Sequence, residues 1–229
     1  MTHTSLPRLL QLSSATLPVG AYSYSQGLEW AVASGAVRDE PSAGQWLETV
    51  LEHGVGSWDA PWLAALMRAA AAEAHGEMAA LNERFLAGRE TRELLAESVQ
   101  TGRAMLDLLR DGGELAPGMR RMLDALDGGG GLAYPTAWAA AAVARRIPIE
   151  DALVGYLWSW LENSVLAALK TVPLGQRAGQ RLLTRLGARL AAIARAAAAR
   201  PHDRCCNFLP GLALASSYHE TQYTRLFRS

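Results

Sequence analysis

Cysteine, aromatic residues and β-branched residues are all scarce in this chain of 229 residues. The two cysteines, Cys205 and Cys206, are adjacent, and neighbouring cysteines rarely form a relaxed disulfide. A disulfide-stabilised domain is therefore excluded, and we expect two reduced thiols, with a soft-metal contact as the alternative. Aromatic residues make up 7% of the chain, and Ala and Leu dominate its hydrophobic half. Because Ala and Leu favour helices, we predict an all-α protein.

Net charge is also absent, since 22 basic residues balance 22 acidic ones. This balance gives no sign of a nucleic-acid or anionic-membrane partner. The chain does not begin with the basic start and apolar run of a signal peptide. Its most apolar stretch, residues 152–169, is interrupted by Glu162, Asn163 and Ser164, whereas a membrane span needs about 20 mainly apolar residues. We therefore expect a cytoplasmic protein that binds neither nucleic acid nor membrane.

Catalytic signatures are missing as well. The sequence contains no GxxxxGK[ST] loop for nucleotide phosphates. His219 and Glu220 resemble the start of an HExxH zinc motif, but the second histidine is replaced by Tyr223. Neither Ser23 nor Ser25 has the flanking glycines of a nucleophile elbow, and the five histidines show no ligand pair on one helix. We expect no enzymatic activity, no cofactor and no metal site within the chain.

Helix signals extend along the whole sequence and predict one bundle of roughly ten helices over residues 1–229. Ser23 or Ser25 can cap a first clear helix that ends near Ala33, and Asp39 precedes the next one. Pro148 opens a long helix that is apolar almost all round and therefore belongs at the centre of the bundle. The other expected helices cover residues 57–73, 89–110, 176–199 and 212–224. Four glycines within residues 127–133 predict a hinge loop, and we expect residues 202–229 to form a partner-binding tail.

Two predicted helices carry patterned faces. In residues 89–110, an apolar stripe is expected from Leu95, Val99, Gly102, Leu106 and Leu109. On another face of that helix, Arg89 and Glu93 are spaced to form a pair.

The helix predicted at residues 176–199 carries a basic stripe of Arg177, Arg181, Arg185 and Arg189. Such a stripe is most simply a solvated face. An acidic protein partner is the second interpretation, and nucleic acid is the third.

Three blocks of the sequence stand out when they are read together. They are LPVGAYSYSQGLEW at residues 17–30, the pair RETREL and KTVPLGQ at residues 89–94 and 170–176, and HETQYTRLFRS at residues 219–229. In this order and spacing they resemble the UreF family of urease accessory proteins, and the resemblance extends over the whole chain.

The resemblance implies an all-α homodimer that acts as a scaffold or checkpoint and not as a catalyst. Proteins of this kind bind the accessory protein UreD, called UreH in some organisms. The pair recruits the nickel-carrying GTPase UreG, and the assembly docks on apo-urease. GTP hydrolysis is then coupled to nickel insertion into the active site.

Candidate partner-binding residues come from three segments. The turn at Tyr22, Ser23 and Tyr24 either caps and packs a helix or presents a surface to the GTPase, and Lys170 either satisfies a helix end or joins that surface. The C-terminal candidates are residues of the types that dominate interfaces, with two polar neighbours. They are His219, Glu220, Tyr223, Arg225, Leu226, Phe227 and Arg228.

Two other classes of function remain open at this point. One is a helical enzyme whose site uses Glu162, Asn163 and one or two histidines. The other is a helical nucleic-acid-binding regulator that uses the basic stripe. The missing catalytic signatures weigh against the first, and the neutral net charge weighs against the second.

Overall fold

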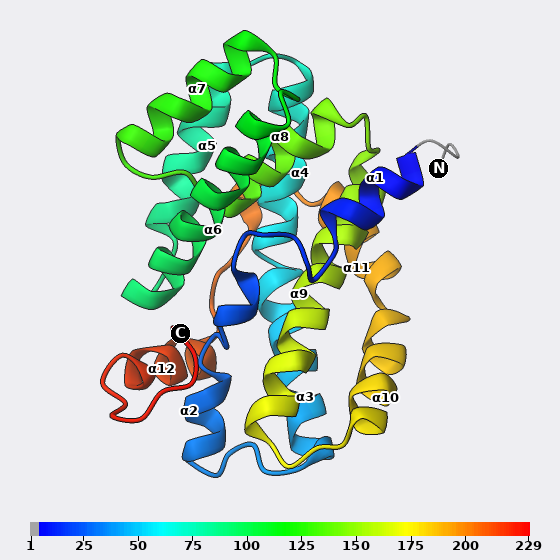
Figure 1. The fold of residues 1–229 in the computed structure, drawn as a ribbon, viewed down its shortest axis with the longest axis vertical. Helices are drawn as coiled ribbons and strands as arrows, with labels where there is room; N and C mark the ends of the chain where they lie inside the picture. Colours follow the sequence, from blue (N-terminus) through cyan, green and yellow to red (C-terminus); the bar gives the residue numbers. More distant parts are fainter. Residues whose placement is uncertain (1–4) are drawn as a thin grey trace.

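The computed structural model describes residues 5–229, and over this range the chain folds into helices without any strand (Figure 1). The all-α prediction is confirmed. No helix within residues 5–229 has both the length and the apolar composition that a bilayer-crossing segment needs. The twelve α-helices of the described residues are α1 (Ser5–Leu12), α2 (Leu28–Ala33), α3 (Glu40–Val50), α4 (Asp59–Ala71), α5 (His75–Ala87), α6 (Arg92–Asp111), α7 (Pro117–Gly128), α8 (Tyr134–Ala144), α9 (Ile149–Thr171), α10 (Gln176–Gly187), α11 (Leu190–Ala199) and α12 (Pro210–His219).

Local side-chain interactions set several helix starts. At the start of α3, the Asp39 carboxylate accepts from the Ser42 backbone N–H (2.9 Å), and the Ser42 hydroxyl accepts from the Asp39 N–H (3.1 Å). This reciprocal cap satisfies amides that a helix N-terminus otherwise leaves unpaired. Thr91 caps α6 through a single bond, in which its hydroxyl accepts the Leu94 backbone N–H (3.2 Å). Both helices begin close to where the sequence predicts.

Helix α9 runs through the middle of the molecule and contacts α1, α2, α3, α4, α10 and α11 (Figure 1). Its Leu153, Leu157 and Leu161 are fully buried. The central position expected for this helix is therefore observed. Helix α8 packs between α4 and α6, and its alanines let these backbones approach closely.

A second, smaller core lies beside the main one, between α2, α3 and the end of α9. We call it the small core, and its buried members are Leu28, Ala31, Val37, Ala43, Ala167, Ala168, Val172 and Phe227. Four of these residues lie within residues 28–43 and three within residues 167–172. Phe227 comes from the C-terminal segment of the chain. The last residues of the chain therefore complete a core that earlier helices begin.

The face predicted for α6 is only partly correct. Gly102, Leu106 and Leu109 are buried, but Leu95 is 37% exposed. The expected Arg89–Glu93 pair is wrong, because Thr91 caps the helix and leaves Arg89 outside it. Arg89 instead forms an ion pair with Asp59 of α4 at 2.7 Å.

The single helix predicted over residues 176–199 is two helices. Helix α10 ends at Gly187 and α11 begins at Leu190. Glycine is a poor helix former, and the break allows both short helices to pack along α9. The last helix also ends earlier than expected, at His219 instead of near residue 224.

The basic stripe on α10 faces acidic residues of this same chain. Arg181 donates to Glu40 at 2.9 Å, and Arg185 and Arg189 lie against Glu48. These contacts join α10, and Arg189 at the start of α11, to α3. An acidic partner for this part of the stripe is therefore supplied internally.

Asn82 of α5 holds the glycine-rich loop at residues 127–133. Its side-chain amide donates to the Gly131 carbonyl (2.9 Å) and accepts from the Ala133 N–H (2.8 Å). Leu132 and Ala133 are fully buried. The C-terminal half of the loop is thus anchored, and the hinge stays a prediction.

Candidate functional site

The three segments that the sequence singles out lie together at one end of the molecule, where α2, α12 and the C-terminus meet (Figure 1). We call residues 220–229 the C-terminal segment. The Arg228 N–H donates to the Ser23 carbonyl (2.8 Å), and the Ser25 N–H donates to the Ser229 carbonyl (2.6 Å). Lys170 Nζ lies 5.5 Å from the centre of the Phe227 ring. Candidates about 200 positions apart in the sequence thus form one contiguous site.

His219 anchors the start of the C-terminal segment. Its ring is fully buried, with Nδ1 at 2.8 Å from a Glu93 oxygen and Nε2 at 3.2 Å from a Glu29 oxygen. Glu29 also accepts the backbone N–H groups of Leu226 (2.6 Å) and Phe227 (2.9 Å). The Glu29 carboxylate therefore joins α2, α12 and the C-terminal segment.

Further contacts fix the segment against α6. Arg225 donates to Glu93 at 2.9 Å, and Glu220 accepts the backbone N–H of Arg92 at 3.0 Å. Gly27, at φ +76°, lies so close to α12 that an added Cβ would approach the Ser216 nitrogen to 2.9 Å. A glycine is required there both by its backbone conformation and by the approach of α12.

The predicted site residues differ in exposure. His219, Phe227 and Tyr24 are buried, so in this structure their side chains hold the site together and do not face a partner. Ser23 and Glu220 are partly buried. The exposed members are Tyr22, Lys170, Tyr223, Arg225, Leu226 and Arg228.

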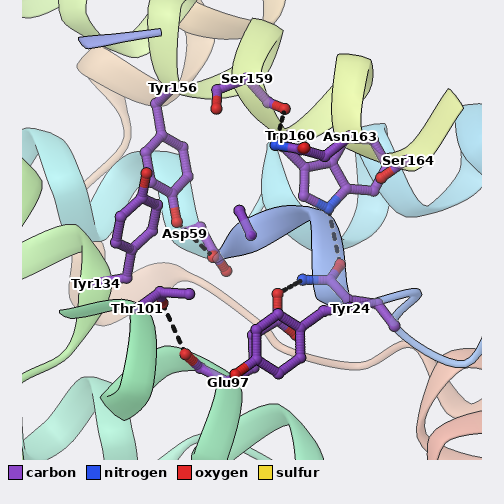
Figure 2. A pocket seen from close by; sticks show the side chains of 12 residues that line it. Tyr24, Asp59, Glu97, Thr101, Tyr134, Tyr156, Ser159, Trp160, Asn163 and Ser164 are labelled. Carbon is purple, nitrogen blue, oxygen red and sulfur yellow. Dashed lines mark hydrogen bonds between the residues drawn. The ribbon is translucent and has the colours of Figure 1, made fainter. Parts of the chain in front are cut away.

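A small cavity lined mainly by polar residues adjoins this site through Tyr24, which forms part of its lining (Figure 2). Its volume is about 60 Å³, which is enough for a few water molecules. Figure 2 shows side chains from α4, α6, α8, α9 and the turn before α2 pointing into it. They include Tyr24, Asp59, Glu97, Thr101, Tyr134, Tyr156, Ser159, Trp160, Asn163 and Ser164.

One wall of the cavity is a buried ion pair. Asp59 receives hydrogen bonds from Arg89 (2.7 Å) and from the Tyr156 hydroxyl (3.1 Å). The Arg89 guanidinium also lies 4.3 Å over the Phe85 ring. Burial, followed by the nearby Asp59 charge, raises the pKa of Tyr156 well above its ordinary value. Tyr156 therefore stays a neutral donor to Asp59.

Glu97 forms the opposite wall. Burial raises the pKa of this carboxyl from 4.5 to about 7. Gln26 donates to Glu97 (2.9 Å) and accepts from the Trp160 indole N–H (2.7 Å). Gln26 has φ +50°, in the left-handed region that few non-glycine residues adopt. Glu97 and Trp160 thus hold the turn that carries Tyr22.

The cavity can hold a proton near neutral pH, but it does not resemble a metal centre. No group of three His, Cys, Asp or Glu side chains in the described part of the chain is arranged to hold a metal ion. Tyr134 Oη and Asn163 Oδ1 line the cavity without a hydrogen-bond partner among residues 5–229. Burial also raises the pKa of Glu162, which does not line the cavity.

Comparison with known proteins decides the family. The UreF family model matches residues 37–187. The urease accessory protein UreF of Azoarcus sp. (strain BH72) is 56% identical over 226 residues, which cover 98% of this chain and 95% of that protein. The UreF proteins of Dechloromonas aromatica and Janthinobacterium sp. are 51% and 45% identical, and each alignment covers 99–100% of both chains. This chain belongs to the UreF family.

Membership settles the broad class of function. The UreF relatives are named as urease accessory proteins and not as enzymes. The hypothesis of a helical enzyme with a site at Glu162 and Asn163 is therefore given up in favour of a urease accessory protein. The UreF match at residues 37–187 includes Asp59, Glu97 and Lys170, and the near-complete alignments also extend over the C-terminal segment.

Sequence reasoning missed the acidic residues that organise this UreF site. Glu29 and Glu93 lie inside two of the blocks that carry the family resemblance, and that location was the available signal. Asp59 and Glu97 gave no such signal, because an isolated acid in a helix normally belongs to a solvated face.

Proposed function

We propose that this protein is a non-catalytic scaffold for urease maturation. It binds UreD, and the pair recruits the GTPase UreG and docks on apo-urease. GTP hydrolysis by UreG then drives insertion of nickel, the cargo of the assembly, into the urease active site. In this proposal the protein works as a homodimer in the cytoplasm and binds neither nucleic acid nor membrane.

The supporting observation is a group of exposed apolar side chains in α12 and the C-terminal segment. We call it the docking surface, and its residues with their exposed fractions are Leu214 (56%), Tyr218 (54%), Tyr223 (101%) and Leu226 (64%). Arg225 and Arg228 are exposed in the same segment. Aromatic and arginine side chains with apolar neighbours are the residue types that most often dominate protein interfaces. We assign UreD to this surface.

The packing of the C-terminal segment makes such docking energetically feasible. A free ten-residue tail would lose on the order of 10 kcal/mol of backbone entropy when it became ordered. Here Glu29 and Glu93 already hold the segment in place. The partner therefore meets a preformed surface, and preorganisation lowers the cost of association.

We assign the neighbouring surface around Tyr22 and Lys170 to the GTPase. Both side chains are exposed at the same end of the molecule, and Lys170 is the single lysine of the chain. Phe227 links the two surfaces, because it packs under Lys170 while its neighbour Leu226 points outward. The complex of UreD with this protein would then present a composite surface to UreG.

Substitution on the docking surface tests this proposal. We expect Leu226→Ala combined with Tyr223→Ala to abolish co-purification with UreD and to lower urease activation in cells. The matched control is Leu10→Ala on α1, where an equally exposed leucine (62%) lies away from the docking surface. The helix content of all variants should match that of the wild type in circular dichroism. Undiminished UreD binding by the double variant would contradict the assignment.

A further inference from the structure

The contacts of His219 show which nitrogens of its ring carry a proton. The ring is fully buried, and each of its nitrogens lies within hydrogen-bond distance of a different glutamate, Glu93 at 2.8 Å and Glu29 at 3.2 Å. An ionised carboxylate only accepts hydrogen bonds, whereas a neutral imidazole has one donor and one acceptor nitrogen. A neutral ring would therefore point a lone pair at one carboxylate. Only a ring with a proton on each nitrogen donates to both.

The other contacts of the two glutamates favour their ionised forms. One oxygen of Glu29 accepts the backbone N–H of Leu226 (2.6 Å), and the other accepts that of Phe227 (2.9 Å). Hydrogen bonds from two backbone amides favour a carboxylate over a carboxylic acid. The Glu93 oxygen that does not face the ring accepts from Arg225 at 2.9 Å, and an arginine side chain is always charged. Two carboxylates thus face the ring from opposite sides.

The charges of this cluster cancel only when the ring is a cation. Within residues 5–229, the charged side chains that contact one another here are Glu29 of α2, Glu93 of α6, His219 of α12 and Arg225 of the C-terminal segment. A neutral ring would leave one negative charge uncompensated, although the Glu29 and Glu93 side chains are only 12% and 9% exposed. An unpaired charge at such depth is strongly unfavourable. The balance therefore favours an imidazolium.

We propose that His219 is an imidazolium that positions the C-terminal segment by binding Glu29 and Glu93 at the same time. The cation joins α2 to α6, which would otherwise bring two carboxylates together. Glu29, held in this way, directs its oxygens to the backbone of Leu226 and Phe227. The segment is held while the ring is charged, and it loosens as pH rises and the ring loses a proton. This inference concerns the free protein and does not rest on the proposed binding of UreD.

¹⁵N NMR of the histidine rings in the full-length protein tests the charge directly. The two nitrogens of an imidazolium have similar chemical shifts, whereas the two nitrogens of a neutral ring differ widely in theirs. The chain has five histidines, and substitution of each of the other four assigns the remaining signals to His219 without changing its contacts. We expect the imidazolium pattern for His219 at neutral pH, and the exposed His53 is the reference for a solvent-accessible ring. A neutral pattern for His219 would overturn the proposal.

Fluorine NMR tests the positioning role. The chain has three phenylalanines, so labelling with fluorophenylalanine gives three signals, which Phe208→Leu and Phe227→Leu assign. As pH rises, the signal of Phe227 should move toward that of the exposed Phe208, with the same midpoint as the His219 ring. The signal of Phe85, which is fully buried in the main core, should stay in place. A Phe227 signal that does not respond when the ring titrates would show that the cation does not position the segment.

Glu220→Gln is the matched control for the charge. Glu220 follows His219 in the chain, but its carboxylate is paired with Arg92 at 3.5 Å. Glu29→Gln should move the titration midpoint of the ring to lower pH, because it removes a negative charge that favours the cation. Glu93→Gln should do the same from the other side of the ring, and Glu220→Gln should move the midpoint much less. Equal midpoints in the wild type and the Glu29 and Glu93 variants would contradict the proposal.

Discussion

Glu97 is a single carboxyl on which several parts of the site depend. It accepts from Gln26, which in turn holds Trp160, and the Ser229 hydroxyl lies 3.5 Å away. Because burial raises its pKa to about 7, its charge changes within the physiological pH range. The turn before α2 and the end of the chain therefore share one proton-binding group.

This shifted pKa predicts a pH-dependent stability. Below about pH 4.5, Glu97 is protonated in both the folded and unfolded states and makes no difference. Between pH 4.5 and 7 the unfolded state releases the proton first, so the free energy of unfolding falls as pH rises. The total loss is at most on the order of 3 kcal/mol. The Glu97→Gln variant should not show this loss. The free energy of unfolding of the variant should therefore increase relative to that of the wild type between pH 5 and pH 8.

Urea unfolding at a series of pH values measures the effect. Glu83→Gln on α5 is the control, since Glu83 is exposed and lies outside the cavity. A difference between wild type and Glu97→Gln that does not change with pH would show that Glu97 ionises normally in the folded protein.

At the scale of elements, the C-terminal segment is a structural part of the fold as well as a candidate interface. Phe227 is 6% exposed in the small core, whereas Tyr223 is fully exposed four residues earlier. Deleting residues 219–229 would therefore open the small core and leave Glu29 and Glu93 without His219. A deletion variant that failed to bind a partner could have lost either its stability or its docking residues. Point substitutions separate these two causes.

Two substitutions in this segment should differ sharply in their effect on stability. Phe227→Ala should lower the free energy of unfolding by about 3 kcal/mol, because it removes a buried aromatic ring and leaves a cavity. Tyr223→Ala should change it by less than about 0.5 kcal/mol. Denaturant melts of both variants measure these values. Similar small changes in the two variants would mean that the segment does not pack as described.

Local signals in the sequence predict the helices well and their long-range contacts poorly. Asp39 and Pro148 mark helix starts through interactions within a few residues, and such signals are readable in one sequence. The partners of His219 lie 126 and 190 positions away, so no spacing rule could identify them. The break between α10 and α11 was missed because Gly187 competes with an otherwise continuous helical pattern. The family resemblance indicates which residues form the candidate site. Which of them are buried cannot be predicted in this way, because burial depends on tertiary packing.

At the scale of the whole molecule, the division into a main core and a small core predicts unequal local stability. Among the described residues, the small core has eight buried members, and Phe227 is the one aromatic residue among them. We expect amide hydrogens of α2 and α12 to exchange through openings of lower free energy than those of α8 and α9. Phe227→Ala should speed exchange in α2 while that in α8 stays unchanged. Hydrogen exchange measured by mass spectrometry tests this, and equal protection of α2 and α8 would contradict it.

The late position of Phe227 has a consequence for the order of events during synthesis. Helices α4 to α9 supply most of the main core, and they leave the ribosome before the C-terminal segment does. The small core cannot close until residue 227 has emerged, although its first members are made near the start of translation. The end of the molecule that we assign to UreD and UreG is therefore completed last. In the proposed assembly, a nascent chain that lacks the C-terminal segment has no finished surface to offer UreD or UreG, so we expect recruitment to follow synthesis of that segment.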